Sequence, residues 1–404
     1  MATNKEQNKL NVPHLRFPEF HGEWCVSTIG EQFDLYSGNT PSRLNKEHFE
    51  GNVNWITSGE LKEHYISDTK EKISEDAATA NNLKLLHPGT FVIAIYGLEA
   101  DGVRGTGSIT CKESTISQAC MAFTQKGDVK NEFLYSWYKK HGNIIGIKYA
   151  QGTKQQNLSY DILEKFHIAY PSQDEQDKLI KFISLLDERI ASQSKLIEDL
   201  KKLKSAIIVE HYRQTEKNEV CVADLGNHFN VGNLAKDDLS ETGKPCIIYG
   251  ELFTTYGEII SQIESHTNKT EGMILSKKGD LLFPSSTTVD AVSLIAPSVI
   301  NVDNVILGGD MFGIHINHNY NTQYLSYYFN HIAKKQLAKF AKGSTIIHLH
   351  YTDIEKAKLL LPSLEEQNRM AKCLVALDKK VSVEQNLLSS LTCQKSYLLQ
   401  QMFI

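Results

Sequence analysis

The chain contains one segment of about 190 residues twice, and this duplication constrains its fold more than any other feature. Residues 149–176 align with residues 340–367 without a gap, at a shift of 191 positions. Identical residues recur at that shift along both copies: Gly59-Glu60-Leu61 and Gly250-Glu251-Leu252, Gly152 and Gly343, Tyr160 and Tyr351, Pro171-Ser172 and Pro362-Ser363, Glu175-Gln176 and Glu366-Gln367, Leu186-Asp187 and Leu377-Asp378. A period of this length is too long for a solenoid, so we expect a duplicated domain rather than a stack of small repeats.

Each copy changes character at a proline. Before Pro171 and Pro362, short apolar runs such as residues 91–95 and 246–249 are bounded by Gly and Pro, which is typical of strands. Shorter helical patterns lie between these runs. After each proline comes a serine suited to an N-cap, and then two acidic residues where the dipole of a starting helix favours them. We therefore expect a mixed domain followed by a long helix, twice.

Both long helices carry apolar residues in a heptad pattern. Steps of four and three residues alternate along each helix, which predicts a coiled-coil seam. The expected seam positions are Leu186, Ile190, Gln193, Ile197, Leu200, Leu377, Val381, Glu384, Leu388 and Leu391. If the helices pack antiparallel with their centres aligned, Gln193 faces Glu384, and this polar pair can fix the register. Alternatively, both residues lie at a solvated edge.

These patterns predict an α+β protein in which two similar mixed α/β domains are separated by two long antiparallel coiled-coil helices. The expected boundaries are 1–171 for the first domain, 172–214 for the first helix, 215–362 for the second domain and 363–404 for the second helix. A helix of about 35–40 residues spans roughly 50–60 Å. Two similar domains at opposite ends of such a rod suit a duplex with two half-sites, since one turn of B-DNA is about 34 Å.

Charge is distributed unevenly along the chain. The formal net charge of −5 argues mildly against a nucleic-acid partner, because phosphate attracts cations. However, residues 133–160 and residues 311–352 contain no Asp or Glu, while each window contains four Lys. The two windows occupy matching places in the repeat, which makes chance clustering on solvated faces a weaker explanation than it is for one window alone.

Several classes of protein are excluded by composition. The seven cysteines form no Cys-x-x-Cys pair, so zinc and disulfide frameworks are not expected. His315, His318, His348 and His350 have no accompanying cysteine or carboxylate ligand set, so we expect them to be surface histidines and expect no metal. No apolar run approaches the roughly 18 residues of a membrane span, and no signal peptide is evident. We expect a cytoplasmic protein.

With these features together, the chain resembles the specificity (S) subunits of type I restriction–modification systems. The resemblance covers nearly the whole chain and rests on the run from Pro13 to Phe20 with Gly22-Glu23-Trp24, on the Leu361–Gln367 run with its weaker copy at 170–176, and on the duplication with two helices. It implies that each mixed domain is a target-recognition domain and that the partner is double-stranded DNA with a bipartite target. It also implies docking of two modification (methyltransferase) subunits that bind S-adenosylmethionine, joined by restriction (endonuclease and translocase) subunits. No cofactor is expected in this chain.

The resemblance also suggests roles for individual residues. The lysine windows would face phosphate, and the polar loop 152–157 is the best candidate for base contact, because Gln and Asn can pair with adenine. The matching loop 343–348 has diverged, as expected if the domains read different sequences. Residues 285–288 are expected to form another exposed polar loop. The residues implicated in DNA binding are Thr57, Ser58, Lys148, Lys154, Gln155, Gln156, Asn157, Tyr249, Ser285, Ser286, Thr287, Lys339, Lys342, Ser344, Thr345 and His348. For each of them, a plain surface loop is the alternative.

Enzymatic functions find little support in the sequence. There is no P-loop and no Asn-Pro-Pro-aromatic run of an amino-methyltransferase. Glu60-Leu61-Lys62 has the Glu-x-Lys spacing of a nuclease, but its counterpart at 251–253 lacks the lysine. We therefore expect a non-catalytic DNA-recognition subunit. A self-contained nuclease or methyltransferase with a coiled-coil dimerisation arm is the alternative, and a scaffold that binds only protein is the third possibility.

Overall fold

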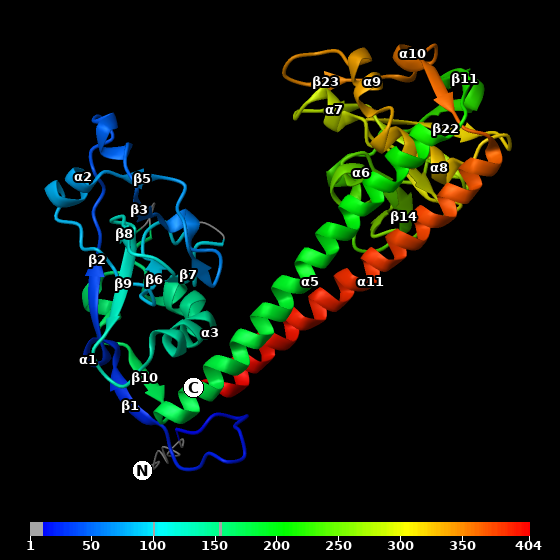
Figure 1. Ribbon diagram of the computed structural model, residues 1–404. Helices are drawn as coiled ribbons and strands as arrows, with labels where there is room; N and C mark the ends of the chain where they lie inside the picture. Colours follow the sequence, from blue (N-terminus) through cyan, green and yellow to red (C-terminus); the bar gives the residue numbers. More distant parts are fainter. Residues whose placement is uncertain (1–10, 100–101, 153–155) are drawn as a thin grey trace. The chain divides into compact units, whose positions relative to one another are not determined.

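The computed structural model describes residues 11–99, 102–152 and 156–404. The chain divides into two compact units (Figure 1). Unit 1 comprises the chain up to Gln193 together with Leu387–Ile404, and unit 2 comprises Ser194–Asn386. Each unit therefore contains one mixed domain and a stretch of both long helices.

Unit 1 is built on a five-stranded sheet that lies against helix α3 (Asn131–Tyr149). In order across the sheet, its strands are β2 (Phe33–Ser37), β9 (Cys120–Gln125), β6 (Phe91–Ala94), β7 (Gly107–Thr110) and β4 (Tyr65–Ile66). All neighbours are antiparallel except β4 and β7, which run parallel. A second sheet has the order β5 (Lys72–Ile73), β3 (Val53–Ile56) and β8 (Ser114–Ile116).

Unit 2 repeats this sheet strand for strand. Its five-stranded sheet has the order β12 (Gly226–Asn230), β22 (Met311–Ile316), β18 (Asp280–Pro284), β20 (Ser298–Ile300) and β15 (Ile259–Ile260), again with only the last pair parallel. The second sheet is larger, with the order β13 (Leu239–Ser240), β16 (Ser265–Thr267), β14 (Lys244–Ile248), β21 (Ile306–Gly308) and β17 (Ile274–Leu275). A short ribbon joins β19 (Ser286–Thr287) to β23 (Ile347–His348).

Each domain is closed by a two-stranded ribbon that precedes a long helix. In unit 1, β1 (Cys25–Thr28) pairs with β10 (His167–Tyr170), and in unit 2, β11 (Asn218–Cys221) pairs with β24 (Lys358–Leu361). The remaining α-helices are short: α1 (Ile29–Gln32), α2 (Glu75–Ala80), α4 (Tyr160–Leu163), α6 (Glu251–Thr254), α7 (Ala291–Leu294), α8 (Thr322–His331), α9 (Lys334–Leu337) and α10 (Tyr351–Ile354). The 3₁₀ helices are η1 (Lys46–Phe49), η2 (Ser58–Glu60), η3 (Val222–Leu225), η4 (Lys236–Asp238) and η5 (Ala338–Phe340).

The two long helices are α5 (Gln173–Gln214) and α11 (Leu364–Met402). Within unit 1, Asp187 of α5 forms an ion pair with Lys395 of α11, and within unit 2, Lys204 of α5 forms one with Asp378 of α11. From the first ion pair to the second, the residue number rises from 187 to 204 on α5 and falls from 395 to 378 on α11, so the two helices run antiparallel. The predicted fold class of two mixed domains with antiparallel helices is thus confirmed.

The expected seam positions are all buried or partly buried. Ile197, Val381, Glu384 and Leu391 are less than a tenth exposed, while the other six have intermediate exposure. Glu384 also forms an ion pair with Lys380 one turn earlier in α11. That Gln193 faces Glu384 stays a prediction.

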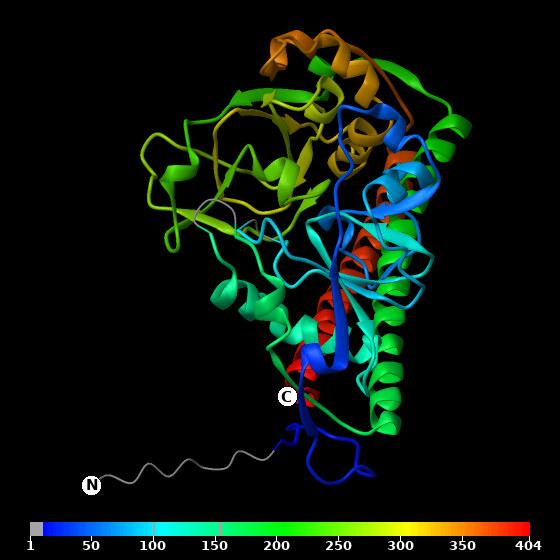
Figure 2. The same ribbon diagram turned by 90° about the vertical axis from the view of Figure 1, so that its left-hand side faces the viewer.

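Each domain shares its hydrophobic core with the helix ends that belong to the same unit. In unit 1, Leu179 and Ile183 of α5 and Leu399 of α11 join a core that includes Phe133. In unit 2, the positions related by the 191-residue shift play the same part: Met370, Leu374 and Ile208. Helix and domain are therefore one packing unit, and the end of α11 lies beside the N-terminal segment, where Leu15 N–H donates to Gln401 O at 2.9 Å (Figure 2).

Candidate nucleic-acid interface

A buried glutamine fastens each domain to the start of its helix. Gln176 accepts a hydrogen bond from Lys130 N–H at 2.9 Å and donates from Nε2 to Pro171 O at 3.0 Å. Gln367 repeats both bonds with Asn321 N–H at 3.0 Å and Pro362 O at 2.9 Å. Both glutamines are at most 1% exposed. The repeated Glu-Gln pair of the sequence therefore fixes the direction in which each domain leaves its helix.

The glutamate of each Gly-Glu-Leu repeat also has a structural part. Glu60 accepts hydrogen bonds from Thr57 N–H at 2.8 Å and from the Thr57 hydroxyl at 2.9 Å. Glu251 accepts from Ile248 N–H at 2.9 Å in the same position of unit 2. The Thr57 hydroxyl, expected at a DNA groove, is thus engaged in a capping contact, and the Glu-x-Lys spacing belongs to a backbone cap rather than to a cluster of acids.

One loop after the sheet is held in the same way in both units. In unit 1 the backbones of Gln151 and Asn157 pair, and Leu158 N–H donates to Ile95 O at 2.9 Å. In unit 2, residues 342–349 form the equivalent loop: Lys342 pairs with His348, and the next residue, Leu349, donates to Ser285 O at 2.9 Å.

Glycine is required where the loop turns. Gly343 has φ of +115°, and a Cβ atom there would meet Ile346 O at 2.0 Å. Gly152 has φ of +120° at the matching position. We call the described residues of these two segments, 151–152 with 156–159 and 342–350, the recognition loops.

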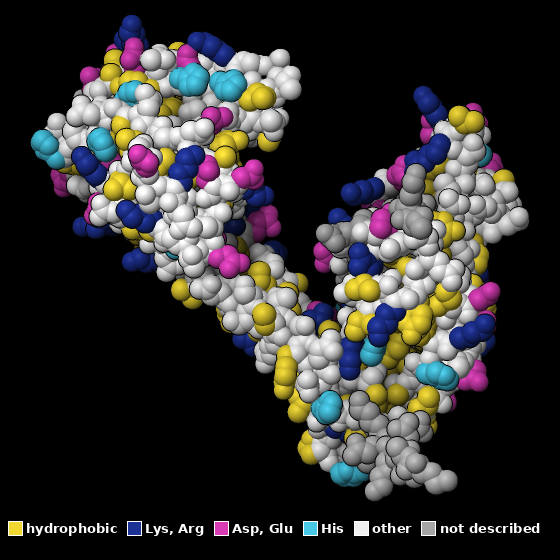
Figure 3. Space-filling model, turned by 180° about the vertical axis from the view of Figure 1, so that it is seen from behind, with side chains coloured by type: hydrophobic (Ala, Val, Ile, Leu, Met, Phe, Trp, Pro, Cys, Tyr) yellow, Lys and Arg dark blue, Asp and Glu magenta, His cyan; other side chains and the backbone are white. Residues whose placement is uncertain are grey.

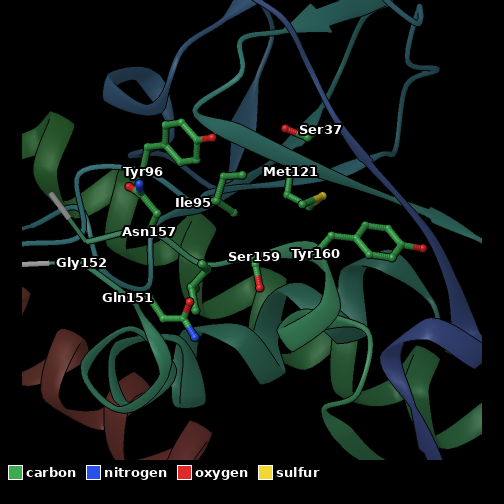
Figure 4. Close-up of a pocket in the computed structure, with 10 residues that line it drawn as sticks. Ser37, Ile95, Tyr96, Met121, Gln151, Gly152, Asn157, Ser159 and Tyr160 are labelled. Atoms are coloured by element: carbon green, nitrogen blue, oxygen red, sulfur yellow. The ribbon is translucent and has the colours of Figure 1, made fainter.

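A concave pocket lies beside each recognition loop. The first recognition pocket is lined by Ser37, Ile95, Tyr96, Met121, Gln151, Gly152, Asn157, Leu158, Ser159 and Tyr160 (Figure 4). The second recognition pocket is lined by Ser285, Asp310, Lys342, Gly343, His348, His350 and Asp353. Because both pockets are formed by equivalent loops, the fold presents two comparable hollows that differ in side chains.

The sequence predicted some of these lining residues and missed others. Asn157, Ser285, Lys342 and His348 were expected to bind DNA, and the structure brings the last three together in one pocket. His350 was not among the expected DNA contacts, and neither were Gln151, Ser159, Tyr160, Asp310 and Asp353. The 191-residue shift could have revealed one of them, because it aligns Gln151 with Lys342, which was predicted.

Lys148 and Lys339, at matching positions, are both exposed and make no ion pair with any residue that the structure describes. The other lysines of the first window differ from expectation. Lys140 donates from Nζ to Phe403 O at 2.6 Å, and burial lowers the pKa of Lys139 to about 8. Lys140 thus caps the end of α11, and Lys139 lies over the Tyr135 ring with its Nζ 5.1 Å from the ring centroid, so the two lysines do not form a phosphate-facing stripe.

Further expected contacts lie elsewhere. Ser344 and Thr345 are exposed on the second recognition loop, Gln156 and Thr287 are partly buried, and Ser58 and Tyr249 are partly buried away from the pocket linings. Lys154 and Gln155 lie outside the described residues. The expectation of an exposed loop is wrong for Ser285 and Ser286, which are 6% and 4% exposed, because β19 pairs with β23 and the Ser286 hydroxyl donates to Asp310 at 2.8 Å.

A charged cluster connects each domain to both long helices. In unit 1, His64 lies 2.8 Å from Glu132 and 3.4 Å from Asp187, which is also paired with Lys395. Burial alone would lower the pKa of His64, but the contacts with Asp187 and Glu132 outweigh it and raise that pKa. The ring is stacked against Tyr135 with centroids 3.9 Å apart.

In unit 2, Lys204 lies 2.9 Å from Glu258 and 2.7 Å from Asp378. Burial alone would raise the pKa of Glu258, but the His331 hydrogen bond and the Lys204 charge outweigh it and lower that pKa to about 2. Asp187 with Lys395 and Asp378 with Lys204 are related by the same 191-residue shift. These clusters are interior ties between helix and domain, and no group of three or more metal-binding side chains occurs in the described part of the chain.

A comparison with protein families decides the identity. The model described as Type I restriction modification DNA specificity domain matches residues 21–202 and again residues 215–392. The chain belongs to the type I restriction–modification DNA specificity family. Members of this family are non-catalytic DNA-recognition components, and this specificity chain carries two recognition domains.

Individual relatives agree with this assignment. The Type I restriction enzyme MjaVIII specificity subunit of Methanocaldococcus jannaschii is 23% identical over 95% of this chain and 92% of its own length. The MjaIX specificity subunit of that organism is 28% identical, in an alignment that spans 45% of this chain and 42% of that subunit. The match to MjaIX thus covers less than half of that relative.

Solved structures show the same fold. The S subunit of a type I restriction–modification system from M. genitalium superposes with a TM-score of 0.59 at 19% identity, covering 97% of this chain and 99% of that one. A chain from a structure on complex assembly and conformational transition of the type I R-M system gives a TM-score of 0.59 at 14% identity, covering 94% and 97%. Among the described residues, a helix with the length and hydropathy of a membrane span is not found.

Proposed function

We propose that this chain reads a bipartite duplex DNA target, one half per recognition domain, through the two recognition loops and their pockets. The observation that carries the proposal is the equivalence of the loops. The backbone is held by the same hydrogen bonds in both units, while the lining side chains differ. A shared frame with different contact groups suits two readers of different sequences, because base edges are distinguished by their donor and acceptor patterns.

Phosphate contacts would come from exposed cations beside the loops. Lys148 and Lys339 are the best placed of these, being at matching positions and without an internal partner among the described residues. Such contacts position the protein and are neutral to sequence. Lys342 is a weaker candidate, since its ammonium group already lies 2.5 Å from Asp353.

The long helices would dock two modification subunits, which would bind S-adenosylmethionine and carry the methyltransferase, and restriction subunits would join them. Exposed apolar side chains on both helices support docking: Leu185, Leu196, Leu203, Val383, Leu387 and Tyr397 are 38–60% exposed. Burial of these side chains against a partner would favour docking through the hydrophobic effect. The presence of two similar domains, each with its own helix ends, supports the proposed number of two modification subunits.

A domain exchange tests the proposal. Residues 20–170 are replaced by the corresponding domain of another specificity subunit, and the methylated sites of cells that carry the complete system are sequenced. We expect one half of the target to change and the other half to stay. A change in both halves, or in neither, would contradict one reader per domain.

The helices are further proposed to set the distance between the half-sites. Four residues inserted next to Gln193 should change the spacing of methylated half-sites and leave both half-sequences intact. The same insertion at Glu216, between α5 and β11, is the matched control and should keep the spacing. Equal spacing in both variants would refute the ruler role.

A further inference from the structure

The two recognition loops carry different chemistry at matching positions. Ionisable side chains in the second loop replace neutral ones in the first, and the aligned pairs are Lys342 and Gln151, His348 and Asn157, His350 and Ser159. All six line the two recognition pockets. The pockets therefore differ in whether their charge can change near neutral pH.

Both histidines of the second recognition pocket are accessible. His348 and His350 are exposed, and their rings lie 6.1 Å apart at an interplanar angle of 13°. Their backbone is fixed, because His348 N–H donates to Lys342 O at 2.7 Å and β23 pairs with β19. Figure 3 shows histidine side chains gathered at the end of unit 2 that carries β23 and α10.

Three other charged groups line the same pocket: Asp353, Asp310 and Lys342. Asp353, at the start of α10, accepts from His350 N–H at 2.9 Å and lies 2.5 Å from the Lys342 ammonium. Asp310, which follows β21, accepts the Ser286 hydroxyl at 2.8 Å. Of the neighbouring elements, α7 is capped by Asp290, the residue before its first turn, and Tyr351 of α10 stacks on His228 with centroids 4.2 Å apart.

The sign of the pocket's charge depends on the histidines. With neutral imidazoles, the two carboxylates outweigh the lysine by one charge, which opposes a polyanion. With both imidazoles protonated, the pocket carries one net positive charge and four additional N–H donors in place of two. The first recognition pocket has only hydroxyl, amide, thioether and apolar side chains, so its charge is constant across the pH range in which histidine titrates, about 5 to 8.

We propose that DNA occupies the second recognition pocket with uptake of protons by His348 and His350, whereas the first recognition pocket binds its half-site independently of pH. The inference rests on the proposed function. The DNA atoms concerned are hydrogen-bond acceptors, either phosphate oxygens or the N7 and O6 edges of purines in the major groove. Recognition of the second half of the target then weakens as pH rises, and recognition of the first half does not.

The test uses the complex with its modification subunits and a duplex that carries the full target. Dissociation constants are measured at pH 6 and pH 8 at constant ionic strength, because DNA affinity depends steeply on salt. Uptake of one proton or more should make binding about ten-fold weaker at pH 8. The double variant His348→Asn with His350→Ser, which installs the residues of the first loop, should reduce the pH 8 to pH 6 ratio to about one. The matched control His87→Gln alters an exposed histidine of unit 1 and should keep the ten-fold ratio.

The reverse variant Asn157→His with Ser159→His should increase the ratio above that of the wild type, which keeps the inference testable if the first double variant folds poorly. A duplex with a scrambled second half-site distinguishes the two kinds of acceptor. The pH 8 to pH 6 ratio of dissociation constants should persist if the histidines contact phosphate, and it should fall to about one if they contact base edges. A wild-type ratio near one, or a ratio that the double variant retains, would overturn the inference. If the dissociation constant at pH 6 is the same for duplexes with and without the two half-sites, the proposed function itself is wrong.

Discussion

The two recognition domains share a frame and differ at their reading surfaces. The frame is preserved in detail: Gln176 and Gln367 make the same buried bonds, and Lys395 and Lys204 pair with equivalent aspartates across the long helices. At the recognition loops, by contrast, the position occupied by Asn157 in unit 1 is occupied by His348 in unit 2. The two copies thus share the contacts that orient each domain and differ in the residues that would face DNA.

The largest expected difference between the units concerns their interior ion pairs. Lys204→Met removes the ammonium group that two partly buried carboxylates, those of Glu258 and Asp378, share, and should cost about 3–5 kcal/mol of unfolding free energy even though Glu258 keeps its contact with His331. Lys395→Met should cost less, because Lys395 pairs with one carboxylate, that of Asp187, whereas Lys204 pairs with two. Denaturant unfolding of the full chain measures both changes.

Lys202→Met is the matched control, since the Lys202–Glu198 pair on the same helix is exposed and should contribute no measurable stability. Equal losses from the two interior lysines would show that the units do not differ as the structure indicates.

The buried glutamines should give equal and intermediate effects. Gln176→Ala and Gln367→Ala each leave buried backbone groups unpaired, which should cost about 1–3 kcal/mol. Thermal unfolding compares the two variants with Gln173→Ala, a control in the same first turn whose hydrogen bond to Asp128 O is exposed. A loss for one glutamine only would break the equivalence of the two helix starts.

The units should also respond to pH in opposite directions. The pKa of His64 is raised in the folded chain, so its contribution to stability is present below about pH 6.5 and is lost as pH rises through the folded value. The difference in melting temperature between wild type and His64→Gln should therefore shrink from pH 6 to pH 9.

The pKa of Glu258 is lowered to about 2, so its contribution in unit 2 is present above the ordinary value near 4.5 and is lost as pH falls toward 2. Wild type and Glu258→Gln should converge in acid. A difference for His64→Gln that grows with pH would contradict the cluster of unit 1.

The smallest effect is expected for a single phosphate contact. Lys339→Ala should weaken DNA binding a few-fold for cognate and unrelated sequences alike and lower the salt slope by about one. Lys148→Ala should do the same in unit 1, and salt-dependent binding curves measure both. If either variant changes the preferred sequence, that lysine contacts a base edge and not phosphate.

Much of the fold could be predicted, because the sequence repeat and the heptad spacing are visible in the order of residues alone. The shift of 191 residues gave the equivalence of the two domains, and the helix starts follow from Pro171 and Pro362, each two residues before the first residue of α5 or α11. The candidate site was predicted less well. Lys139 and Lys148 look alike in the sequence, yet Lys139 is partly buried over the Tyr135 ring and Lys148 is exposed.

The sequence by itself determined the doubled architecture and the seam pattern of the long helices. Both can be recognised without knowing how distant residues pack, because the heptad spacing lies within each helix and the repeat lies in the order of residues. Only the tertiary structure decided which charges are used internally. Lys140 meets Phe403, and Lys204 meets Asp378, across separations of 263 and 174 residues. Such pairs depend on how distant segments pack, and this packing is what leaves His348 and His350 together in an open pocket.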